Sequence, residues 1–141
     1  MVKQITVFLE NSEGRLSALC RCLGDAGVSM KALTIAETSE YGLIRIIADD
    51  PQSCVKVLTD GGFHASLTDV TAIEVPNRAG GLADLLDKLA DLDLNIEYGY
   101  CFSTEADRAV DVLKIKGGAK AAEAVFALEA AGFRVLKQDE L

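Results

Sequence analysis

Apolar and polar residues alternate along several short segments of the chain, and apolar residues at helical spacing fill the stretches between them. In the first half of the chain the alternation predicts strands over 5–9, 28–37, 42–48 and 63–67. Leucines three or four positions apart predict a helix over 16–26. Pro51 suits the first turn of a second helix that stops at Gly61. The predicted order is strand, helix, two strands, helix, strand.

The same pattern then occurs a second time. A shift of 66 residues carries Asn11 to Asn77 and Gly14 to Gly80, and it also superposes the leucines of the two helices. In this second copy we predict strands over 70–75, 94–103, 108–115 and 133–137. The corresponding helices are predicted over 80–92 and 119–131. Glycines, apolar positions and an asparagine that match in one register indicate an internal repeat.

This order of elements is typical of the ferredoxin-like βαββαβ unit, an α+β fold with a four-stranded antiparallel sheet and both helices on one face. We predict two such units, residues 1–68 and 69–141. A unit of this size buries only about 60% of its unfolded surface and is marginal alone. No linker richer than Leu67-Thr68-Asp69 separates the copies, so we expect them to pack as a tandem pair.

Composition narrows the possible partners. The chain has 141 residues, 50% of them hydrophobic, and a net charge of −8. Lysine and arginine occur singly, which argues against nucleic acid or an anionic membrane surface as a partner. No apolar run reaches the roughly 18–20 residues of a membrane span, and the first residues lack the pattern of a signal peptide. We therefore expect a soluble, cytoplasmic protein.

Metal and enzyme chemistry find little support in the sequence. Cys20 and Cys22 lie two apart on a predicted helix, so their side chains diverge by about 200° and cannot share a metal. With Cys54 and Cys101 they are expected to be reduced core residues. His64, the single histidine, is expected on the surface of a strand, far from any nucleophile that it could activate. We predict no metal, no cofactor and no catalytic residue.

The repeat resembles a known family. An apolar strand, Asn-x-x-Gly-x-Leu at the start of a helix, and a short Gly-Val-Ser/Asn-Ile approach to the second strand are similar to the ACT domain. The resemblance covers both copies and is closest to stand-alone tandem ACT proteins that carry no enzyme domain. The family often has proline before the glycine, where this chain has Glu13 and Ala79. The resemblance implies an amino-acid site at an interface between two ACT units.

In that family the turn before the first helix and the start of the second strand form the pocket. Carried over position by position, the resemblance implies ligand-binding residues in both copies: Asn11, Glu13, Gly14, Arg15, Leu16, Ser29 and Met30, then Asn77, Ala79, Gly80, Gly81, Leu82, Asn95 and Ile96. Unpaired N–H groups of a helical first turn favour an anion such as a carboxylate, and an asparagine side chain can accept from an ammonium. The same pattern also describes an ordinary turn with an N-terminal cap.

The two loops are not equivalent, because Arg15 in the first copy stands where the second has Gly81. Arg15 is either a contact for a ligand carboxylate or a solvated helix residue; we expect the first loop to be the better site. Glu97 can similarly be a contact for a ligand ammonium or a solvated residue. Apolar side chains among the implied residues suit a branched-chain or aromatic ligand.

The resemblance implies an amino-acid-binding regulatory protein that acts on a separate enzyme of amino-acid metabolism, and we expect a homodimer formed through sheet edges or helices. Two alternatives stay open: an assembly subunit of an enzyme complex that binds no ligand, and an enzyme on the same scaffold.

Overall fold

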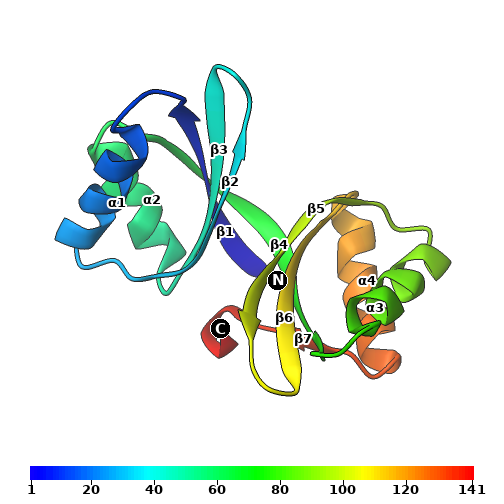
Figure 1. Ribbon diagram of the computed structural model, residues 1–141. Helices are drawn as coiled ribbons and strands as arrows, with labels where there is room; N and C mark the ends of the chain where they lie inside the picture. Colours follow the sequence, from blue (N-terminus) through cyan, green and yellow to red (C-terminus); the bar gives the residue numbers. More distant parts are fainter. The chain divides into compact units, whose positions relative to one another are not determined.

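The computed structural model describes residues 1–141, apart from the side chain of Ser103. The chain forms two compact units: Lys3–Thr68, here called the first unit, and Met1–Val2 with Asp69–Leu141, here called the second unit. Each unit carries a pair of helices on one side of an antiparallel sheet (Figure 1). The predicted α+β class, with two βαββαβ units, is confirmed.

In the first unit a four-stranded sheet has the order β2-β3-β1-β4. Its elements are β1 (Val2–Glu10), α1 (Arg15–Asp25), β2 (Met30–Glu37), β3 (Tyr41–Ala48), α2 (Pro51–Asp60) and the first part of β4 (His64–Pro76). Alternate residues of β1 face the helices, as the sequence pattern predicts, and they pack on Leu19 and Leu23 of α1. Leu58 of α2 and Phe63 complete this core, where every member is less than 9% exposed.

The second unit repeats this arrangement with the order β5-β6-β4 and with β7 also paired to β4. Its elements are the rest of β4, α3 (Gly81–Asp91), β5 (Ile96–Thr104), β6 (Arg108–Ile115), α4 (Gly118–Ala130), β7 (Arg134–Leu136) and a 3-10 turn (Gln138–Glu140). Leu85 and Leu89 of α3 pack on Ile73 and Leu113 of the sheet, with Leu128 of α4 beside them. The core of each unit therefore lies between its own helices and its own sheet.

One predicted boundary is wrong. The strands expected over 63–67 and 70–75 are a single strand of 13 residues, β4 (His64–Pro76), so Leu67-Thr68-Asp69 is not a linker. The physical reason is visible in the sequence: neither glycine nor proline interrupts the strand before Pro76, and β-branched residues continue through it. Pro76 ends the strand as predicted, at a position where a missing N–H does no harm.

The cysteines are free thiols across the residues that the structure describes. Cys54 lies in the first core, and burial raises the pKa of its thiol to about 11. Cys20 and Cys22 are partly buried against the same core. Cys101 is exposed on β5, at one edge of the second sheet, so the expectation of a core residue is wrong there. Over the described chain, no helix has the length and hydropathy needed to cross a membrane.

The packing of α3 gives the first prediction. Leu85 is fully buried, whereas Leu82 on the same helix is 43% exposed. We expect Leu85→Ala to lower the free energy of unfolding by about 2–5 kcal/mol because it leaves a cavity in the core. Leu82→Ala is the matched control and is expected to change stability by less than about 0.5 kcal/mol. Urea denaturation followed by circular dichroism measures both; equal effects would contradict this description of the core.

Candidate functional site

The turn before α1 is fastened to the hairpin between β2 and β3. The backbone N–H of Asn11 donates to the carbonyl of Glu40 at 3.0 Å, and its side-chain Nδ2 donates to the carbonyl of Thr38 at 3.3 Å. The N–H of Arg15 then donates to the carbonyl of Ser12 at 3.3 Å, which closes the turn at the helix start. The asparagine thus holds two loops together.

The turn before α3 repeats these bonds in the second unit. Asn77 donates its backbone N–H to Asp107 at 3.0 Å and its Nδ2 to Glu105 at 2.7 Å, both through carbonyl oxygens. The N–H of Gly81 donates to the carbonyl of Arg78 at 3.0 Å. Two turns of different sequence therefore share the same pattern of hydrogen bonds, which supports the register of the repeat.

The asparagines do not cap the helices. Gly14 precedes α1 with φ 81°, Gly80 precedes α3 with φ 85°, and neither helix start has a side-chain cap. Only glycine adopts this left-handed conformation without strain, so the two matched glycines have a structural reason. The side chain of each asparagine instead donates through its Nδ2 to the neighbouring hairpin.

The polar residues implied by the resemblance do not come together within one unit. Asn77 is tied to Glu105, just after the end of β5, whereas Asn95 precedes the beginning of that strand. Nine residues of strand span roughly 25–30 Å. In the first unit Asn11 and Ser29 stand in the same way at the two ends of β2. In each unit the asparagine of the turn is therefore separated by a strand length from the polar residue that precedes the strand.

The Arg15 side chain lies against the first unit and does not extend into solvent. Its guanidinium carbon lies 4.8 Å from the centre of the Phe63 ring, and its Nε is buried without a hydrogen-bond partner among the described atoms. A guanidinium over an aromatic face gains a cation–π interaction of about 0.5–1 kcal/mol or more. The side chain thus packs on the first core, and this contact differs from both roles considered for it.

Gly81 is held to glycine by its surroundings. A Cβ added there would collide with the carbonyl oxygen of Pro76, so no larger residue fits this turn. Arg78 lies over the same turn, where it donates to the carbonyl of Ala79 at 3.0 Å and to a carboxylate oxygen of Asp84 at 2.7 Å. The second turn is consequently compact, with its basic side chain already paired.

A cavity of about 400 Å³ lies between α3 and the sheet of the second unit. This volume is within the range of about 300–1,000 Å³ that small-molecule pockets occupy. Of the residues implied by the resemblance, Leu82 and Ile96 line it. The complete lining is Leu82, Leu86, Ile96, Gly99, Tyr100, Cys101, Asp111 and Leu113. Apolar side chains dominate the walls, and Asp111 is the one charged residue in this lining.

Two residues of this lining differ in kind from their counterparts when the repeat copies are aligned through their strand registers. Gly99 pairs with Leu113 in the second unit, where Leu33 pairs with Ile46 in the first. A side chain at Gly99 would press on Leu113, since an added Cβ would lie 2.6 Å from its Cδ2. The second copy therefore has a glycine beside the Leu113 side chain where the first copy has a leucine.

Asp111 is the second of these residues. It faces Ile73 on β4, whereas Ile44 faces Val7 at the corresponding place in the first unit. Its residue surface is only 7% exposed. Burial raises the pKa of this carboxyl above its ordinary value, because an apolar environment disfavours the charged form. A charged carboxylate at a buried position lowers the stability of the fold unless a cation or a hydrogen-bond donor pairs with it.

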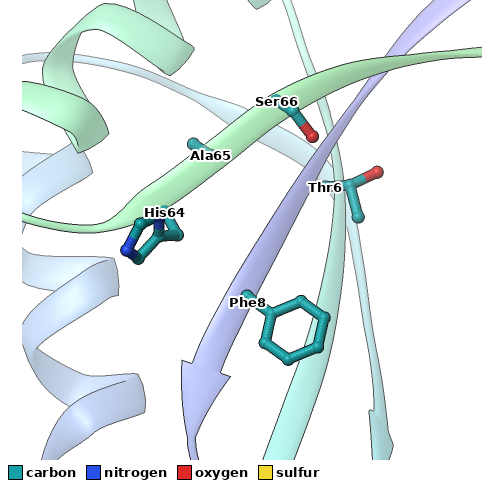
Figure 2. Close-up of a pocket in the computed structure, with 5 residues that line it drawn as sticks. All are labelled: Thr6, Phe8, His64, Ala65 and Ser66. Atoms are coloured by element: carbon teal, nitrogen blue, oxygen red, sulfur yellow. The ribbon is translucent and has the colours of Figure 1, made fainter.

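A second pocket, of about 440 Å³, lies on the face of the first sheet that is turned away from the helices. Figure 2 shows Thr6 and Phe8 projecting from β1 and His64 and Ser66 from β4, with Ala65 between them. His64 is exposed on its strand, as expected. None of the residues implied by the resemblance is in this lining, and we place the candidate site in the cavity of the second unit.

The sequence reasoning missed Gly99, Asp111, Leu86 and Leu113. A signal for Asp111 was present: the register of the repeat sets an aspartate at a strand position where the first copy has isoleucine. Recognising this difference requires the alignment of β6 with β3. The pattern of turns and helices does not supply that alignment.

The chain is thus a duplicated βαββαβ unit with a cavity of about 400 Å³ between α3 and the sheet of the second unit. Residues 1–133 match the family described as an ACT domain pair, and the chain belongs to this family. Proteins of this kind are regulatory. Among curated proteins, no sequence matches the chain.

Solved structures agree with this assignment. Protein BT0572 from Bacteroides thetaiotaomicron is 33% identical, with a TM-score of 0.90 over 99% of this chain and 94% of that one. The regulatory subunit of aspartate kinase from Thermus thermophilus has a TM-score of 0.65 at 16% identity, over 92% of this chain and 91% of that chain. The corresponding subunit from Thermus flavus has a TM-score of 0.61, also at 16% identity and with the same coverage. The Thermus structures show the shared fold.

The loop tether gives the second prediction. Asn77→Ala removes a 2.7 Å hydrogen bond and is expected to cost about 0.5–1.5 kcal/mol of stability. Asn11→Ala is expected to cost less, because its bond is 3.3 Å long. Asn95→Ala is the matched control and should stay within about 0.5 kcal/mol of the wild type. Chemical denaturation measures all three, and a cost for Asn95→Ala equal to that for Asn77→Ala would contradict the assigned tether.

The buried carboxylate gives the third prediction. Its pKa is raised in the folded state, so its charged form opposes folding at neutral pH. Asp111→Asn should therefore raise the melting temperature of the ligand-free protein at pH 7. The difference should shrink as the pH falls through the raised folded-state pKa and vanish below the unfolded value of about 3.9, where both states bind the proton. Asp87→Asn, at an exposed position of α3, is the control; a destabilised Asp111→Asn would contradict the prediction.

Proposed function

We propose that this ACT pair is a regulatory protein that binds a free amino acid and controls a separate enzyme of amino-acid metabolism. The observation that carries the proposal is the cavity of the second unit, which adjoins the start of α3 and has apolar walls with one carboxylate. Its size and lining suit a small amphipathic molecule.

The elements around the cavity offer complementary chemistry for an amino acid. Leu82, Leu86 and Leu113 provide an apolar surface that favours a branched-chain or aromatic side chain. Leu82 is also the second residue of α3, where the N–H groups of the first turn have no partners within the helix. Such groups and the helix dipole favour a carboxylate.

A second ACT unit is part of the proposal. Asn77 and Asn95 stand at opposite ends of β5, so one unit does not bring these two side chains to a single ligand, although Leu82 and Ile96 line one cavity. We therefore include a homodimer, in which a partner chain provides a complementary unit. A ligand that completes a pocket between units stabilises the arrangement that contains it, and this differential affinity is what regulation requires.

The solved structures that share this fold support a separate enzyme as the target of regulation. Two of the similar structures are regulatory subunits of aspartate kinase, which suggests that this chain acts on a catalytic partner in the same manner.

The fourth prediction tests this function. In a thermal-shift screen of the twenty common amino acids at millimolar concentration, at least one is expected to raise the melting temperature, because a ligand that binds only the folded state stabilises it by about 2.7 kcal/mol at a hundred times its Kd. Light scattering after size-exclusion chromatography should show a change in the proportion of dimer with that ligand. No response to any amino acid, together with co-purification of a synthase or ligase, would instead favour an assembly subunit.

A further inference from the structure

We propose that Asp111 binds the ammonium group of the ligand and that each chain has one such site, in the cavity of the second unit. The inference rests on the proposed function, since it assigns the recognition chemistry of the same cavity. It also names the class of ligand: an amino acid with a free α-ammonium group and a neutral, apolar side chain.

The position of Asp111 in the sheet directs this residue toward the helices. β6 places it between Ala109 and Leu113, and both of these belong to the core that the helices cover. Side chains two residues apart on a strand share one face. The carboxylate therefore lies on the inner face of the sheet, where the cavity opens beside it.

The carboxylate has no partner within the chain. Among the described residues, no hydrogen bond or ion pair engages Asp111, and burial is the one cause of its altered pKa. At 7% exposure it is also largely withdrawn from solvent. A buried carboxylate normally has a cation or several donors beside it. A ligand ammonium in the adjoining cavity supplies that partner.

The first unit shows that the fold does not need a carboxylate at this place. Ile44 occupies the corresponding position on β3, is 1% exposed and belongs to the first core. Leu33 similarly stands where the second unit has Gly99. The same architecture is thus built with apolar side chains at both positions in one copy and with a carboxylate and a glycine in the other. The difference assigns the ammonium site to the second unit alone.

The lining also limits which side chains the ligand can carry. With Asp111 as the one charged residue there, a second cationic group on the ligand would have no counterpart, and an acidic side chain would be repelled. Leu82, Leu86 and Leu113 instead favour an apolar group. The α-carboxylate is left to the first-turn N–H groups of α3 at the Leu82 end of the cavity.

The test uses the full chain and isothermal titration calorimetry, with L-valine, L-leucine, L-isoleucine, L-methionine and L-phenylalanine as probes. At least one probe is expected to bind the wild type with a stoichiometry of one per chain. Asp111→Asn should weaken that binding at least about 30-fold, because it removes the charge opposite a desolvated ammonium. Asp87→Asn removes the same charge from an exposed position of α3 and should bind like the wild type.

Two further measurements hold even where Asp111→Asn folds poorly. The desamino analogue of the best probe (4-methylpentanoate for leucine) should fail to bind the wild type, since it lacks the ammonium. The bound probe should also slow alkylation of Cys101, which is exposed and lines the cavity, as followed by peptide mass spectrometry. Cys54 is an internal reference in that experiment, because burial raises its pKa to about 11 and keeps its thiol unreactive.

The outcomes separate this inference from the proposed function. If a probe binds the wild type and Asp111→Asn with equal affinity, or with two sites per chain, the ammonium site is overturned while amino-acid binding stands. The same holds if only charged amino acids bind. If none of the twenty amino acids binds the wild type, both proposals are wrong.

Discussion

Each unit depends on covering one face of its sheet with two helices. The units are small, so the apolar contacts between leucines of the helices and alternate strand residues supply most of what opposes chain entropy. Under that constraint a charge on the covered face is a serious disadvantage. The second unit nevertheless carries Asp111 there, and Gly99 lines the same cavity. The proposed ammonium site would give this unfavourable charge a role.

The turns at the helix starts obey a different constraint, which is geometric. Asn11 and Asn77 fasten their turns to the neighbouring hairpins through matching backbone and side-chain bonds, although the residues around them differ. Glu13 and Ala79 stand where the family often has proline, and these bonds provide an alternative source of stiffness. A fixed helix start keeps the first-turn N–H groups in one place, which is a requirement for recognising a carboxylate.

The repeat pattern was sufficient to predict the fold because turns and helix faces are encoded locally. Gly14 and Gly80 need a left-handed backbone, and the leucines of α1 and α3 need one buried face. The continuity of β4 was missed because a polar stretch such as Thr68-Asp69 is equally compatible with a link and with a strand that has a solvated face. The cavity was missed for another reason: Leu82, Gly99 and Asp111 are far apart in sequence, and only strand register brings them together.

Because the unit is duplicated, one copy can have apolar side chains where the other carries a buried carboxylate and a glycine. The first unit has Leu33 and the buried Ile44 at these two positions and packs Arg15 on Phe63, so it carries no buried carboxylate there. The second unit leaves a carboxylate unpaired, and a bound ammonium would give that charge the partner that the chain withholds. The ligand would then stabilise the protein most at the place where the ligand-free unit has a charge without a partner. Under the proposed binding this gain exists only in the occupied state, so the ligand would stabilise whichever arrangement of the protein contains it, which is the thermodynamic basis of regulation by a ligand.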